Sequence, residues 1–127
     1  MGRRCEGTYF NPAILTDVTP DMPRYDLELF GPVATVYVVD DEEAAIKLAN
    51  DSSYGRGGSI YTRDISRGRR VAEQIETGMM FVNQPTNSQA ELPFGGIKNS
   101  GYGRELSHLG ILEFVNKKFI HLGPLSE

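Results

Sequence analysis

The stretch ELPFGGIKNSGYGRE, at residues 91–105, holds four glycines in fifteen residues. Gly95 and Gly96 follow an apolar step, and Gly101 and Gly103 flank a tyrosine. Glycine allows a backbone turn with positive φ and lets the chain approach another surface closely. The stretch therefore predicts a tightly folded loop, which leads into a helix that begins near Arg104 and ends near residue 112.

Before this loop, the sequence alternates between apolar runs and helical patterns. The run VATVYVV, at 33–39, is typical of a strand buried on both faces, as in a parallel sheet covered by helices. Asp40 and Asp41 are candidate caps for a helix that we expect to end near residue 50. We expect its buried face to hold three apolar residues, namely Ala45, Leu48 and Ala49.

The same alternation continues with a strand at 57–62, a helix at 65–77 and a strand at 79–83. Asp64 is the candidate N-cap of this second helix, and Gly78 suits the position just after its end. The order strand, helix, strand, helix, strand predicts the α/β class, with one short parallel sheet and crossover helices. A last strand is expected at 114–122. Because a three-stranded sheet leaves two open edges, we expect the chain to be part of a larger protein or to assemble with other copies.

Composition excludes several function classes. The 127 residues suffice for one modest domain, and a net charge of −4 gives no indication of nucleic acid or a membrane as partner. Neither a secretory signal nor a membrane-spanning run is present in the sequence. The single cysteine, Cys5, cannot form an internal disulfide, so we expect a cytoplasmic protein. The two histidines and Cys5 lack ligand spacing, so no metal site is expected.

The glycine-rich stretch resembles the C-terminal signature of the NAD(P)-dependent aldehyde dehydrogenases, PFGG-x-K-x-SG-x-GRE. Ten positions match at fixed spacing, namely Pro93, Phe94, Gly95, Gly96, Lys98, Ser100, Gly101, Gly103, Arg104 and Glu105. ELFGPV at 28–33 is similar to the family's E-x-F-G-P-V motif, and LANDSSYG at 48–55 is similar to its A-N-x-[ST]-x-Y-G motif. The resemblance runs from about residue 7 to 122. One departure is Arg56, where the family usually has an apolar residue.

The resemblance implies an enzyme that oxidises an aldehyde to the acid with NAD or NADP as cofactor. Residues 1–113 would belong to the catalytic domain, and 114–127 would be an oligomerisation strand and tail. In the family, the cysteine nucleophile, the general base and most of the dinucleotide site lie upstream of these motifs. We therefore expect no catalytic residue here and no activity from the isolated chain. Cys5, in the context RRCEG, does not match the catalytic cysteine.

The resemblance assigns two residues to cofactor binding. The family's motif glutamate accepts hydrogen bonds from both hydroxyls of the nicotinamide ribose, and the aromatic residue two positions on packs beside the nicotinamide. Here these positions are Glu28 and Phe30. The alternative is structural, with Glu28 a solvated loop acid and Phe30 a core residue.

In the family that the chain resembles, the loop before PFGG lines the mouth of the aldehyde tunnel, and here this loop is QPTNSQAEL, at 84–92. Its side chains are polar, and hydroxyls and amides can hydrogen-bond a substrate carboxylate. The loop is similar to that of succinate-semialdehyde dehydrogenases, with Asn87 and Ser88 as candidate substrate contacts and Phe94 in the apolar wall. The alternative is an exposed polar loop that binds nothing. Lys98, Arg104 and Glu105 are expected to hold loop and helix together by charged hydrogen bonds.

A second function class is open. The chain could be an interaction module without catalytic role, using the tail strand and the open sheet edges to join other copies or intact subunits. As part of an enzyme, its partners would be a small aldehyde and the missing N-terminal part.

Overall fold

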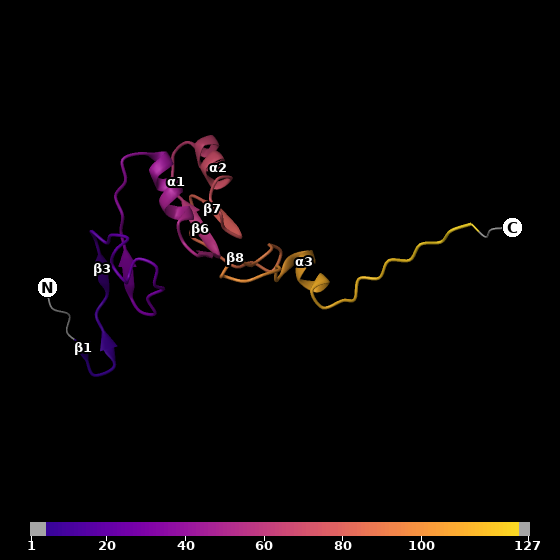
Figure 1. Cartoon of the computed structure of the whole chain (residues 1–127), viewed down its shortest axis with the longest axis horizontal. Coiled ribbons are helices and arrows are strands. Elements are labelled where there is room, and N and C mark those ends of the chain that lie inside the picture. The colour runs from indigo at the N-terminus through magenta and orange to yellow at the C-terminus, as the bar shows by residue number, and fades with distance from the viewer. Residues whose placement is uncertain (1–4, 125–127) are drawn as a thin grey trace. The chain divides into compact units, whose positions relative to one another are not determined.

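The computed structural model describes residues 5–124, and side chains from residue 7 on (Figure 1). The chain divides into two compact units, the first ending at Ser53 and the second beginning at Tyr54. Each unit is described by itself.

The first unit contains two small strand pairs and one helix. An antiparallel pair joins β1 (Cys5–Glu6) to β2 (Tyr9–Phe10), and a parallel pair joins β3 (Ala13–Leu15) to β4 (Val33–Thr35). In the parallel pair, Ala13 lies opposite Val33 and Leu15 opposite Thr35. The helix α1 (Glu42–Asn50) follows. The β3–β4 pair positions the residues just before β4, which include both candidate cofactor contacts.

The long buried strand predicted at 33–39 is wrong in two respects. Only Val33–Thr35 is a strand, and the apolar residues that follow are exposed, with Val38 at 94%. An apolar run becomes a two-sided buried strand only where layers cover both faces, and the described residues supply none over this segment. The sequence thus carries apolar surface that its own first unit leaves uncovered.

The helix α1 begins where the sequence predicts. Asp41 is its N-cap, and Asp41 Oδ1 accepts a hydrogen bond from Ala44 N at 2.8 Å. Glu42 and Glu43 lie in the first turn, where the helix dipole favours negative charge. The predicted buried face is only partly correct, because Leu48 is half-buried whereas Ala45 and Ala49 are exposed.

The second unit contains a parallel pair, an antiparallel pair and two helices. The parallel pair joins β6 (Gly57–Ile60) to β7 (Met79–Val82) through α2 (Ile65–Ala72). The antiparallel pair joins β5 (Tyr54–Gly55) to β8 (Ile97–Lys98), and α3 (Ser107–Leu112) follows. The helix expected from Arg104 therefore begins three residues later.

The β6–α2–β7 crossover is closely packed. Gly68 is buried in α2, and a Cβ at this position would lie 2.8 Å from Cγ1 of Val82 in β7. Asp64 is the N-cap as predicted, since Asp64 Oδ1 accepts from Arg67 N at 3.0 Å. The helix ends at Ala72, five residues earlier than predicted, because the chain continues through tight turns. Gly78 is therefore not its C-terminal cap, and lies against the glycine-rich loop instead.

The strands do not form the single sheet that their order predicts. β4 pairs with β3, and β6 pairs with β7, so the parallel strands form two separate pairs. The α/β class with small parallel sheets is confirmed, and the single three-stranded sheet is wrong. The order of elements predicts a βαβ crossover well, but pairing between more distant strands depends on contacts that local patterns do not encode.

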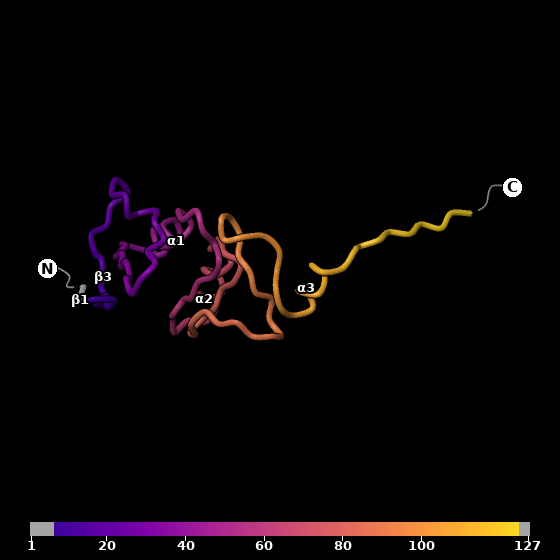
Figure 2. Tube along the Cα trace, turned by 90° about the horizontal axis from the view of Figure 1, so that it is seen from below, coloured from indigo at the N-terminus to yellow at the C-terminus, as the bar shows by residue number. Residues whose placement is uncertain are grey.

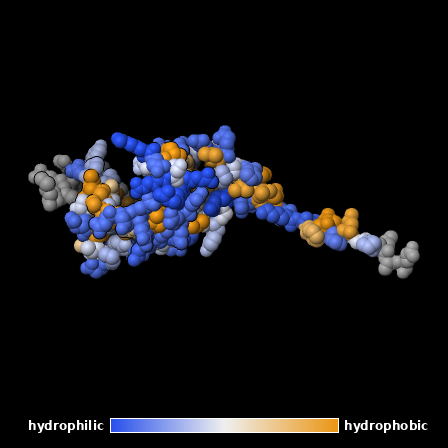
Figure 3. Space-filling view, turned by 90° about the horizontal axis from the view of Figure 1, so that it is seen from above, coloured by the Kyte–Doolittle hydropathy of each residue, from blue (hydrophilic) through white to orange (hydrophobic). Residues whose placement is uncertain are grey.

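The segment that follows α3 is extended and exposed. Residues 114–124 contain neither helix nor strand, so the last strand predicted at 114–122 is absent (Figures 1 and 2). Phe114 is 88% exposed and Leu122 is 90% exposed, and Figure 3 shows apolar side chains along this tail. A strand requires a partner for its backbone groups, and the described residues offer this segment none.

Val18 is the only buried apolar side chain among the described residues. Within the same residues, no helix is long and apolar enough to cross a membrane, and no group of side chains could hold a metal ion. Much apolar surface therefore remains available for contacts outside the two units.

Candidate functional site

The two candidate cofactor residues lie in the loop that leads into β4. This loop is fixed by its backbone, because Ala13 N donates to Pro32 O at 2.9 Å and Val33 N donates to Gly31 O at 2.8 Å. Glu28 is exposed, and the ring of Phe30 is 93% exposed. The alternative role of Phe30 as a core residue is therefore wrong for this unit, whereas Glu28 has the exposure that either of its two roles requires.

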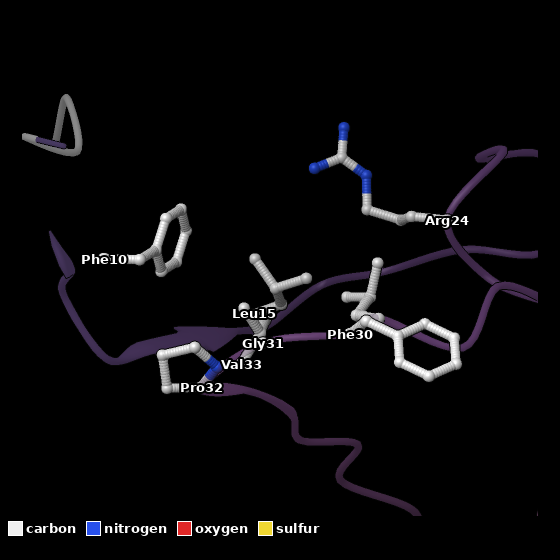
Figure 4. Close-up of a pocket in the computed structure, with 8 residues that line it drawn as sticks. Phe10, Leu15, Arg24, Phe30, Gly31, Pro32 and Val33 are labelled. Atoms are coloured by element: carbon white, nitrogen blue, oxygen red, sulfur yellow. The ribbon is translucent and has the colours of Figure 1, made fainter. Parts of the chain in front are cut away.

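Phe30 lines a pocket of about 450 Å³ in the first unit (Figure 4). Leu15 and Val33, from the β3–β4 pair, form part of its wall. Phe10 and Phe30 lie at opposite ends with Leu15 between them, and the side chain of Arg24 extends from a separate loop. Seven of the eight lining residues are apolar or glycine, and Arg24 is the only charged one. The pocket thus combines aromatic and aliphatic surface with one guanidinium.

The loop that carries Arg24 is held by two turns and a tyrosine. Met22 N donates to Thr19 O at 3.0 Å, and Tyr25 N donates to Met22 O at 2.9 Å. The hydroxyl of Tyr25 donates to Asp51 Oδ2, at the C-terminus of α1, at 2.6 Å. This hydrogen bond raises the pKa of Tyr25 to about 12, because the carboxylate accepts from the protonated phenol. The loop is therefore attached to the C-terminus of α1.

The candidate substrate loop lies in the second unit. Residues 84–92 are all exposed and contain neither helix nor strand. Ser107 N donates to Ala90 O at 2.9 Å, and Leu92 N donates to Gln89 O at 3.1 Å, so the end of the loop is attached to α3. Asn87 and Ser88 lie before this attachment with their side chains available to a ligand.

Phe94 follows this loop and forms a backbone pair with Glu105. Its N–H donates to Glu105 O at 2.8 Å, and Glu105 N donates back to Phe94 O at 2.7 Å. Phe94 is half-buried, so it is partly available as an apolar wall. The glycine-rich stretch is thus closed at its two ends by a backbone pair.

Inside that stretch, glycines permit backbone contacts that side chains would block. A Cβ at Gly78 would collide with the carbonyl oxygen of Gly95 and lie 2.8 Å from the Cα of Gly96. Arg104 Nη1 donates to the carbonyl oxygens of Gly96 at 2.9 Å and Gly103 at 2.6 Å. The predicted tightly folded loop is confirmed. Arg104 makes charged hydrogen bonds as predicted, but both acceptors lie inside the loop rather than in the helix that follows it.

The ends of the β5–β8 pair are closed by side chains. Lys98 Nζ lies 2.8 Å from Glu76 Oε2, and Gly55 N donates to Ser100 Oγ at 3.0 Å. Lys98 in β8 thus pairs with Glu76 in the segment after α2, whereas the sequence predicted a charged contact between this loop and the helix that follows it. Glu105 contributes through its backbone, which pairs with that of Phe94. Arg56 is exposed, and its Cα would lie 3.2 Å from a Cβ at Gly96.

The structure places the predicted site residues in two groups. Glu28 and Phe30 belong to the first unit, and Asn87, Ser88 and Phe94 belong to the second. Their roles stay predictions. Sequence analysis did not identify Arg24 or Phe10 as site residues. The sequence feature that could have drawn attention to Arg24 is its place four positions before Glu28.

Comparisons with known proteins give a consistent result. The model of the aldehyde dehydrogenase family matches residues 2–120. The chain is 54% identical, over 99% of its length, to succinate-semialdehyde dehydrogenase [NADP(+)] of Deinococcus radiodurans, of which it covers 27%.

Two solved structures are similar as well. Gox0499 is 57% identical with a TM-score of 0.89, over 96% of this chain and 27% of that one. Succinic semialdehyde dehydrogenase from Streptococcus pyogenes, solved with NADP+ as the cofactor, is 51% identical with a TM-score of 0.83, over 87% of this chain and 24% of that one. The chain thus spans about a quarter of the length of the relatives it matches.

Proposed function

The chain belongs to the aldehyde dehydrogenase family, and on this basis we propose that it is the C-terminal part of an NAD(P)+-dependent enzyme that oxidises a small carboxy-aldehyde. The favoured substrate is succinate semialdehyde. One observation carries the proposal: the chain matches a succinate-semialdehyde dehydrogenase over 99% of its length at 54% identity.

In this function, the loop before β4 binds the nicotinamide end of the cofactor. The Glu28 carboxylate accepts hydrogen bonds from the two ribose hydroxyls, and the ring of Phe30 packs beside the nicotinamide. The exposure of both residues supports these roles, because each would be accessible to a ligand. Both hydroxyls exist in NAD+ and in NADP+, so these contacts serve either cofactor.

The exposed polar loop at 84–92 binds the distal carboxylate of the aldehyde. Ser88 donates its hydroxyl and Asn87 its amide, while Phe94 contributes apolar wall to the tunnel. This set suits a short substrate that is charged at its far end, since a neutral aldehyde would leave the polar groups without partners.

The exposed tail favours assembly in addition to this function. Residues 114–127 would pair with another copy or with the rest of the enzyme, and the exposed apolar side chains at 114–124 support this role. The same observation supports the second candidate function, an interaction module without catalysis. We also propose a cytoplasmic location, because the single Cys5 cannot form an internal disulfide and so fits a reducing compartment.

A chimeric enzyme tests the main proposal. This chain replaces the matching quarter of the Deinococcus radiodurans enzyme, and oxidation of succinate semialdehyde is followed by NADPH formation. We expect NADP+-dependent turnover from the chimera and none from the 127-residue chain alone. A chimera that folds and assembles but does not turn over would favour the interaction module, and turnover by the isolated chain would refute the expected inactivity.

A substitution in the chimera tests the substrate class. Removing a hydrogen bond to a charged group costs about 1.5–3 kcal/mol, so Ser88→Ala is expected to raise the KM for succinate semialdehyde by about tenfold or more. The KM for butanal, which lacks the carboxylate, should not change. Ser66→Ala, an exposed serine in α2, is the matched control. An equal effect on both aldehydes would argue against the carboxylate contact.

A further inference from the structure

Arg24 is the charged residue among those that line the pocket beside Phe30, and the proposed function gives it no role. Its guanidinium carries five N–H donors in a planar fork. Among the described residues, no group forms an ion pair with this guanidinium or accepts a hydrogen bond from it. A guanidinium placed in a mainly apolar pocket without an acceptor is suited to an oxyanion that arrives with a ligand.

The position of Arg24 is set by its neighbours. The backbone turns at Thr19–Met22 and Met22–Tyr25 precede and include its position, and the Tyr25 hydroxyl is bound to Asp51. Figure 4 shows the side chain reaching from this loop over the pocket, with its guanidinium turned away from its own backbone. A loop held in this way presents the guanidinium with less entropic cost than a free surface arginine would incur.

The residues around Arg24 indicate what kind of ligand carries the oxyanion. The ring of Phe30 lines the same pocket and offers an exposed face to a planar group. Glu28 lies two residues before Phe30, is exposed, and is the proposed acceptor for the ribose hydroxyls. The phosphate of a nucleotide follows directly on its ribose. We propose that Arg24 binds the phosphate on the nicotinamide side of the dinucleotide, an inference that rests on the proposed function of Glu28 and Phe30.

A substrate carboxylate is the other oxyanion that the enzyme would meet. Arg24 lines its pocket together with Phe30, the proposed nicotinamide contact. A guanidinium binds carboxylates and phosphates alike through two parallel N–H donors, so the neighbours of Arg24 decide between these two ligands. The phosphate is therefore the ligand that these observations favour.

Titration of the 127-residue chain provides the first test. Binding of nicotinamide mononucleotide, nicotinamide riboside and succinate is followed through the side-chain Nε–Hε signal of Arg24 in nitrogen-15 NMR spectra. We expect only the mononucleotide to shift this signal, and its affinity to fall as salt rises. A shift by succinate instead, or by the riboside to the same extent, would overturn the proposal.

Two variants separate charge from packing. The stem of an arginine can serve simply to cover apolar surface, and Arg24→Met keeps such a stem without the charge. We expect Arg24→Met to weaken mononucleotide binding about tenfold and to leave riboside binding unchanged, and Arg24→Lys to retain part of the affinity. Equal binding by Arg24→Met and the unchanged chain would show that Arg24 only packs.

The same variants in the chimeric enzyme give a second measurement that does not depend on binding by the isolated chain. Arg24→Met should raise the KM for NADP+ about tenfold and leave the KM for succinate semialdehyde unchanged. An active chimera in which Arg24→Met leaves the KM for NADP+ unchanged would refute this inference alone. A chimera without NADP+-dependent turnover would instead refute the proposed function on which it rests.

Discussion

Gly78→Ala is expected to destabilise the second unit by about 3 kcal/mol. The new Cβ would collide with Gly95 O and lie 2.8 Å from both Gly95 C and Gly96 Cα, whereas ordinary contact begins at 3.4 Å. All three atoms belong to the backbone, so no side-chain rotation can relieve the overlap. Overpacking costs about 1–3 kcal/mol when side chains can adjust, and a clash with backbone belongs at the upper end of this range.

The assay is urea denaturation of the 127-residue chain, followed by circular dichroism. With a slope of about 1.5 kcal/mol/M, a loss of about 3 kcal/mol lowers the midpoint by about 2 M. Gly123→Ala is the matched control, because a Cβ there meets nothing within 4 Å. We expect this control to shift the free energy of unfolding by less than about 0.5 kcal/mol. Equal midpoints for the two variants would refute the close approach of Gly78 to the glycine-rich loop.

Three further predictions concern single side chains. Asp41→Ala removes the N-cap of α1 and should cost about 1 kcal/mol in the same denaturation assay, whereas Asp40→Ala should cost little. The raised pKa of Tyr25 means that its hydrogen bond to Asp51 stabilises fully below pH 10 and is lost as the pH rises from 10 to about 12. Tyr25→Phe should abolish that part of the pH dependence, and an unchanged pH profile would count against the bond. Arg104→Met removes two donors to backbone carbonyls and should cost about 2 kcal/mol, measured by the midpoint in urea.

The parts of the fold that the sequence predicts well are those with local causes. The N-caps at Asp41 and Asp64 form with amides three residues away, and β7 lies within the run predicted for it. The tight loop at 91–105 follows from its glycines. Each of these features depends on a few neighbouring residues, so a short pattern contains the necessary information.

The features that the sequence missed depend on distant partners. The run at 33–39 and the tail at 114–122 have the composition of strands, yet the first forms a strand only over Val33–Thr35 and the second forms none. Ala45 and Ala49 have helical spacing without a layer to cover them. Arg24 was missed because a lone arginine has no pattern, and only the pocket places it beside Phe30.

The family membership rests on ten matched positions and on the match to residues 2–120, whereas the roles of the site residues rest on exposure and position. The most direct test of the central claim, that Glu28 binds the nicotinamide ribose, is the kcat/KM for NADP+ of Glu28→Gln in the chimeric enzyme. Removal of the charge weakens two hydrogen bonds, so we expect a decrease of about tenfold to a hundredfold. Glu43→Gln, an exposed glutamate in α1, is the matched control and should match the unchanged chimera. A Glu28→Gln chimera with the kcat/KM of this control would contradict the account.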